Sequence, residues 1–152
     1  MRWTLLLFAA FVGCSSPVSN GDDLQALINA GTGRQPGIID FWYDPPLIDV
    51  PTTATVGDSV TIAVTTYLLG TCMAEGDTKV SIVDSILTVE PFDVLDLPPL
   101  QYGQYFCNSQ LEVANHDVRI AFDEPGDVTV EIRGRYWPEN EPWARQYKIT
   151  VN

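Results

Sequence analysis

The sequence has few of the residues that enzymes use for acid–base and metal chemistry. Its 152 residues include a single histidine, His116, and three cysteines. A Ser-His-Asp or Cys-His site would have to use His116, and no nucleophile motif lies beside it. No Cys-x-x-Cys spacing occurs, which argues against zinc. We therefore predict a protein that is not an enzyme, with no metal and no cofactor, and we expect His116 to be a surface or edge residue.

Positive charge is also scarce. The chain has 8 basic and 20 acidic residues, a formal charge of −12. Such an acidic surface repels phosphate backbones and gains nothing from anionic lipids, so we expect no nucleic-acid partner. Several acids near strand ends carry the oxygen donors that calcium prefers, but they lack EF-hand spacing, and we interpret them as solvated turn residues. These acids are Asp93, Asp96, Asp123, Glu124 and Asp127.

The apolar run at the amino terminus is too short to span a bilayer, which takes about 20 residues. It covers residues 3–12, follows Met1-Arg2, and ends at Gly13-Cys14, as in a signal peptide. The segment Phe11-Val12-Gly13-Cys14 resembles the lipobox of bacterial lipoproteins, with Phe where Leu is usual. The resemblance implies removal of residues 1–13 and a lipid on Cys14, consisting of a thioether-linked diacylglycerol and a further acyl chain such as palmitate.

The implied anchor places the protein in the bacterial cell envelope and makes the membrane its first partner. Two or more acyl chains give stable attachment. Ser15 follows Cys14, and by resemblance to diderm lipoproteins the lack of Asp there favours the outer membrane, on its periplasmic or surface face. Residues 14–36 would form a lipidated tether, polar at first, with one short helix predicted at residues 23–30.

Lipidation of Cys14 would leave Cys72 and Cys107 as an even pair. In an exported protein such a pair predicts a disulfide. The bridge would close a loop of about 35 residues and stabilise the fold by about 3–4 kcal/mol. Both cysteines lie at loop or strand-end positions, so we expect a bridge between loops. The alternatives are two free thiols or a metal site.

From residue 37 the pattern becomes that of short β-strands. Apolar and polar residues alternate, and turn signals such as Glu124-Pro125-Gly126-Asp127 separate the segments. The pattern predicts about seven strands and no convincing helix. The strand segments are residues 38–43 with 47–51, 60–65, 78–83, 86–92, 118–123, 128–133 and 147–151.

This spacing favours an all-β fold, an immunoglobulin-like antiparallel β-sandwich over residues 37–152. The stretch from Val50-Pro51 to Val56-Gly57-Asp58 and the closing strands resemble bacterial immunoglobulin-like domains. The Trp that such domains bury against a core disulfide is missing. The resemblance concerns the fold and implies no activity.

The predicted loop from Arg135 to Trp143 is the main candidate binding surface. Its candidate residues are Arg135, Tyr136, Trp137 and Trp143. Loops that expose aromatics and arginine are common at binding hot spots. We therefore predict a non-enzymatic binding or structural lipoprotein with an envelope protein as its partner. The alternative for Trp137 and Trp143 is that they fold back as lids on the end of the sandwich.

The same loop supports a second functional hypothesis. Arg135-Tyr136-Trp137 resembles the Arg-Pro-Trp loop of chagasin-type cysteine protease inhibitors, which also have an immunoglobulin-like fold. The remainder departs from that family, because Thr65 to Gly70 replaces its Asn-Pro-Thr-Thr-Gly loop. The resemblance implies inhibition of a papain-like protease by the segment Arg135–Trp143.

Overall fold

The computed structural model describes residues 33–42, 44–97 and 107–152. The predicted signal peptide, Cys14 and the predicted helix at residues 23–30 lie outside these ranges. The described residues form ten strands and no helix, so the all-β prediction is confirmed. It follows that the described part of the chain has no helix suited to crossing a membrane.

The strands fall into two groups by length. Four have two to four residues each: β1 (Arg34–Pro36), β2 (Ile38–Phe41), β3 (Ile48–Asp49) and β4 (Thr53–Ala54). Six have 10 to 12 residues each. These are β5 (Ser59–Leu69), β6 (Met73–Val83), β7 (Ile86–Leu95), β8 (Leu111–Ala121), β9 (Gly126–Trp137) and β10 (Glu141–Val151).

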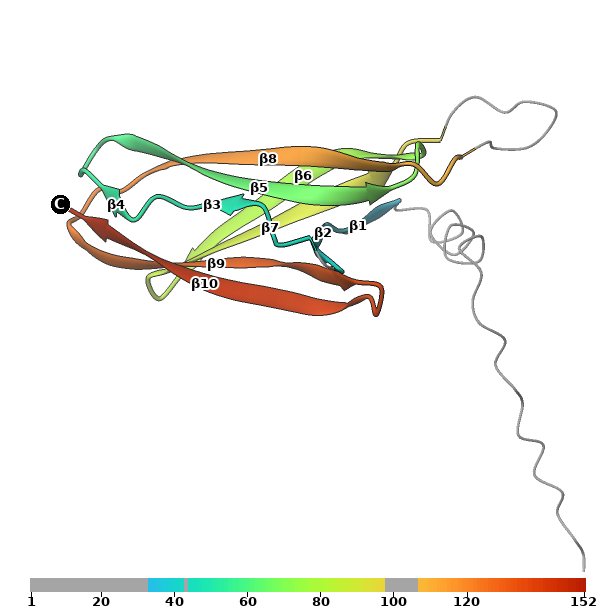
Figure 1. Cartoon of the computed structure of the whole chain (residues 1–152). Helices are drawn as coiled ribbons and strands as arrows, with labels where there is room; N and C mark the ends of the chain where they lie inside the picture. Colours follow the sequence, from blue (N-terminus) through green and yellow to red (C-terminus); the bar gives the residue numbers. More distant parts are fainter. Residues whose placement is uncertain (1–32, 43, 98–106) are drawn as a thin grey trace, which may run out of the picture.

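The strands form a sandwich-like arrangement of two layers (Figure 1). In one layer β5 lies between β8 and β3. In the other the order is β6-β7-β9-β10, with β4 beside the end of β10. β2 pairs with both β5 and β9 and so joins the layers, and β1 pairs with β7. The strand order is open, because β6 and β8 each pair with one described strand only.

The sheet is mixed, so the prediction of a purely antiparallel sandwich is wrong. β9 runs parallel to β7 and to β2, and β4 runs parallel to β10. β6 and β7 form an antiparallel hairpin, and its second strand, β7, is the one that pairs with β9. β7 and β9 therefore run in the same direction. Alternation of side chains is the same in parallel and antiparallel strands, so the sequence pattern carried no information on direction.

The core lies between the layers and uses the predicted alternating positions. Each fully buried Val, Leu or Ile side chain stabilises the fold by about 1.5–3 kcal/mol relative to exposure. The inward positions of β5, β7, β9 and β10 supply most of them. The most deeply buried apolar residues are Ile39, Ile62, Val64, Leu87, Val89, Val130, Ile132 and Ile149.

β9 and β10 extend further than the sequence pattern indicated. Their pairing is continuous from Val151↔Gly126 to Glu141↔Tyr136, so the turn contains only residues 138–140. The prediction of a loop from Arg135 to Trp143 is therefore wrong in extent. Pro142 is tolerated because this end of β10 pairs with β9 alone among the described strands, so a missing N–H costs no ladder bond.

The disulfide between Cys72 and Cys107 is confirmed. The two Cα atoms are 5.3 Å apart, and 35 positions separate the residues in the chain. Cys72 lies in the turn between β5 and β6, and Cys107 precedes β8. The bridge therefore joins two connections at one end of the sandwich, as expected from the sequence.

Candidate functional site

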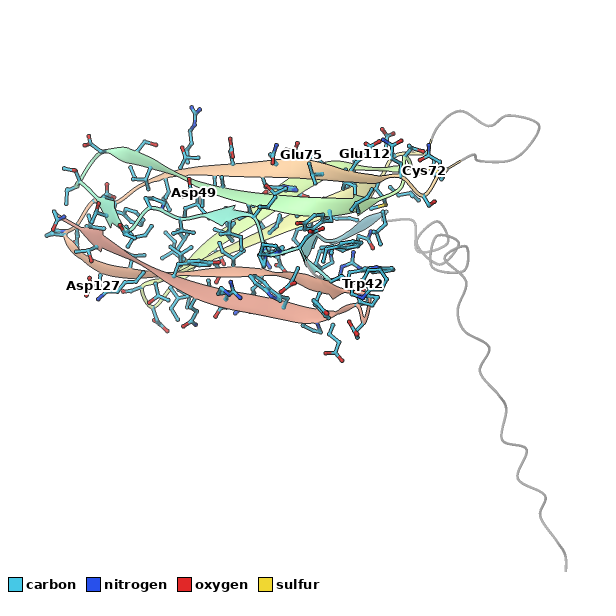
Figure 2. The ribbon with its side chains drawn as sticks, viewed as in Figure 1. Trp42, Asp49, Cys72, Glu75, Glu112 and Asp127 are labelled. Atoms are coloured by element: carbon cyan, nitrogen blue, oxygen red, sulfur yellow. A yellow bond between two sulfur atoms is a disulfide. The ribbon has the colours of Figure 1, made fainter. Side chains whose placement is uncertain are left out.

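The predicted binding residues gather at the end of the molecule that holds the β9–β10 turn. Figure 2 shows Trp42 and Cys72 at this end and Asp127 near the opposite one. The backbone N–H of Trp42 donates to the carbonyl of Trp137 at 3.2 Å, which places two indoles on adjoining segments. Trp42 is 58% exposed, whereas Trp137 is half-buried. No pattern in the sequence marks Trp42 as a binding residue.

Arg135 holds this end together. Its Nε donates to the carbonyl of Pro36 at 2.6 Å, and its Nη1 donates to Oδ1 of Asn140 at 2.5 Å. Asn140 has a φ of 59°, in the left-handed region that asparagine tolerates better than most residues. Arg135 therefore links β1 to the β9–β10 turn, and much of its hydrogen-bonding capacity serves the fold.

Trp143 closes the same end of the core. It is half-buried and packs against the core cluster. Its indole N–H donates to Oδ2 of Asp40 at 3.0 Å, and the guanidinium carbon of Arg145 lies 5.4 Å from the ring centroid. This geometry matches the lid interpretation for Trp143.

A shallow hollow of about 440 Å³ lies between β1, β7, β9 and β10. Arg133 and Arg135 contribute to it from β9, and Glu90 contributes from β7. The charged side chains of the hollow also make internal contacts, Arg133 with Glu131, Arg135 with Pro36 and Asn140, and Glu90 with Lys79, and most of the remaining lining is apolar. The lining residues are Pro36, Glu90, Arg133, Gly134, Arg135, Asn140, Pro142, Trp143 and Ala144.

His116 lies on the edge strand β8, but its side chain is buried in the core, so the expectation of a surface position is wrong. Its exposed fraction is 2%, and those of Thr66 and Asp93 are 0% and 1%. The Thr66 hydroxyl donates to Oδ1 of Asp93 at 2.8 Å and lies 3.2 Å from Nε2 of His116. Nδ1 of His116 lies 3.0 Å from the Thr78 hydroxyl. These four residues form the polar core cluster.

The polar core cluster uses both ring nitrogens of His116. Nδ1 faces the Thr78 hydroxyl, whereas Nε2 faces the Thr66 hydroxyl and the Asp93 Oδ1 atom, which lies at 3.5 Å. Thr66, Asp93 and His116 are buried, and Thr78 is half-buried. Because β5 and β8 belong to one layer and β6 and β7 to the other, the cluster ties the layers together.

The acids considered for calcium do not converge. Asp93 is buried in the polar core cluster, which corrects its interpretation as a solvated turn residue. Oδ2 of Asp127 lies 2.7 Å from Nζ of Lys148, and hydrogen bonds from Lys148 and Thr150 hold the pKa of Asp127 below its usual range. Within residues 33–42, 44–97 and 107–152 no three His, Cys, Asp or Glu side chains are grouped to hold a metal ion.

Comparisons of the chain with protein-family models, curated proteins and solved structures find no match. Functional inference therefore depends on the residues and contacts of this chain alone.

Proposed function

We propose that the protein is a lipid-anchored, non-enzymatic component of the bacterial cell envelope that binds an envelope partner through the end of its sandwich. The Cys72–Cys107 disulfide is the observation that supports this most. A disulfide is typical of an oxidising, exported setting. It also uses two of the three cysteines and leaves Cys14, which directly follows the apolar run and Gly13.

The anchor is tested by expressing the full chain in a diderm bacterium and measuring the intact mass. We expect a chain that begins at Cys14 and carries the mass of a diacylglycerol and an acyl chain. The Cys14→Ala variant should lose that mass and leave the membrane fraction. A wild-type chain that retains residues 1–13 or carries no lipid would contradict the anchor.

We propose further that the sandwich is immunoglobulin-like. Pairing of β5 with β8 and of β9 with β10, and the position of β4 beside β10, support this assignment. The parallel β7–β9 pair departs from the plan. Folds of this kind serve many functions, so the assignment supports a binding scaffold without naming its ligand.

The partner surface that we propose comprises Trp42, Trp137 and the hollow beside Arg133. Exposed tryptophans contribute strongly to binding energy. Trp42→Ala should weaken capture of an envelope partner by tenfold or more, about 1.4 kcal/mol, with an unchanged Tm, because Trp42 is 58% exposed. Trp137→Ala should weaken capture as well but should also lower the Tm, because Trp137 is half-buried. The exposed Val56 at the other end of the molecule supplies the control, Val56→Ala. If both tryptophan variants captured the same partners as wild type, this surface would not be the site.

The alternative function is inhibition of a papain-like cysteine protease. Placement of Trp137 beside the β9–β10 turn favours it, because the resemblance to chagasin-type inhibitors concerns a loop between the last strands. The short turn and the internal contacts of Arg135 give it less support than the binding proposal. Measuring papain activity in the presence of this protein tests the inhibitor alternative. Absence of inhibition at micromolar protein would rule it out.

A further inference from the structure

The core-facing side of β6 is open near the β6–β7 turn. Val80 pairs with Val89 and Ile82 with Leu87, so their side chains lie on the same face as two fully buried core residues. Yet Val80 is 41% exposed and Ile82 is 60% exposed. Among the described strands β6 pairs with β7 alone, so one edge of its backbone is also unpaired with any of them.

The other edge strand differs. Three inward residues of β8, Ala114, His116 and Val118, are buried. Figure 1 shows that the β6–β7 hairpin runs obliquely from the β8 side towards the β9 side, so its tip extends away from the opposite layer. Val83, 64% exposed, and Ile86 pair with each other at the tip, with side chains on the opposite face of the hairpin. We call Val80 and Ile82 the β6 apolar strip.

We propose that the β6 apolar strip pairs with the same strip of a second copy of this chain. The two β6 strands would lie antiparallel about a twofold axis at Ser81. Val80 would then be opposite Ile82 of the partner subunit, and Lys79 would be opposite Val83 of the partner subunit. Four branched apolar side chains would meet on the open face, and the free backbone edges would pair.

Charge favours this strand and this register. The whole chain has a formal charge of −12, but residues 78–86 contain only Lys79 and Asp84, one charge of each sign. Repulsion between two copies is therefore small at this strip. A twofold axis at Lys79 would place two ammonium groups opposite each other, which the axis at Ser81 avoids. A single strand buries less than the roughly 800 Å² per partner of a standard interface, so we expect a weak dimer.

Cysteine cross-linking of the full chain tests this proposal. In an antiparallel pair, residues directly opposite have Cα atoms about 4.5–5.5 Å apart, within the range that a disulfide bridges. Ser81→Cys should therefore give a disulfide-linked dimer under mild oxidation, with twice the mass of the chain. Adding Ile82→Lys should reduce this dimer about tenfold or more, because it puts a charge into the apolar contact.

The matched control is Asp117→Cys, an exposed position on the other edge strand, β8, which should not cross-link. A Tm for Ile82→Lys equal to that of wild type shows that the variant folds, as its exposure predicts. The proposal is overturned if Ser81→Cys gives no dimer, if Asp117→Cys gives as much, or if Ile82→Lys leaves the yield unchanged. A cross-linked product with a different protein would also overturn it.

Discussion

At the residue scale, the hydroxyl of Thr66 serves two buried ionisable side chains at once. It donates to Asp93 and lies beside Nε2 of His116, and Gly37 packs so closely that a Cβ there would overlap Thr66. Extending the predicted strand at residues 118–123 back by two residues would have placed His116 on the core side. Its hydroxyl and carboxylate partners come from strands distant in sequence, so no local pattern could reveal them.

Thr66→Val keeps the shape of the side chain and removes the hydroxyl. Because Asp93 and His116 would each lose a hydrogen-bond partner in the core, we expect destabilisation of about 1–3 kcal/mol in urea unfolding. Thr65→Val is the control, since that hydroxyl donates to Oδ1 of Asn115 in an exposed hydrogen bond, whose loss should change the stability by about 0.5 kcal/mol. Equal effects of the two variants would argue against a structural role for the polar core cluster.

Asp127 gives a prediction about pH. Hydrogen bonds from Lys148 and Thr150 lower its pKa in the folded state. A carboxyl with a lowered folded pKa stabilises the protein above its unfolded pKa, about 3.9, and this stabilisation disappears as pH falls through the folded pKa. Wild type should therefore exceed Asp127→Asn in free energy of unfolding near neutral pH, and the difference should shrink in acid. A difference that is constant with pH would contradict the linkage.

At the element scale, the sequence located strands well and their ends poorly. The sequence pattern did not predict the first residues of β8 as a strand. There the larger apolar side chains, Leu111 and Val113, face outward, and the small Ala114 faces inward. In β7, Pro91 lies inside the strand opposite Thr78, beside a register shift between Glu75 and Thr78. An irregularity of this kind accommodates a residue without an N–H. Whether such a residue fits inside a strand depends on neighbours that are close in space but distant in sequence. The sequence pattern therefore did not show the full extent of β7 and β8.

The β6–β7 turn offers a stabilising substitution. Asp84 and Ser85 have φ values of 50° and 64°, a conformation that costs L-residues with a Cβ about 1–2 kcal/mol each. Ser85→Gly should stabilise the protein by about 0.5–1 kcal/mol, since glycine adopts this conformation freely but loses more entropy on folding. The urea midpoint measures it. Ser81→Gly, inside β6, should instead destabilise, and a rise in the midpoint for both would contradict the explanation.

At the scale of the whole molecule, the alternation of apolar and polar residues predicted the all-β class, and the even pair of cysteines left by lipidation of Cys14 predicted the disulfide. The parallel β7–β9 pair and the joining of the layers by β2 were out of reach, because strand direction and layer contacts depend on the path of the whole chain. The sequence located the β9–β10 turn that carries the proposed surface, but it did not reveal Trp42, which is distant in sequence and adjoins Trp137 only through folding.

The disulfide stabilises the molecule by restricting the unfolded chain. Replacing both residues, Cys72→Ala with Cys107→Ala, should lower the free energy of unfolding by about 3–4 kcal/mol. Reduction of the wild type should have a similar effect in the same denaturation experiment. Little change in either case would mean that the bridge adds nothing beyond the packing around it.

The position of that bridge also determines how the protein responds to proteases. Cys72 and Cys107 enclose β6, β7 and the connection to β8, so a single cut anywhere between them leaves two fragments joined through sulfur. A nicked chain would keep the mass of the intact one, plus water, until it is reduced. If Cys14 carries the proposed anchor, the fragment that ends the chain would stay joined through Cys107 to the anchored fragment until the bridge is reduced.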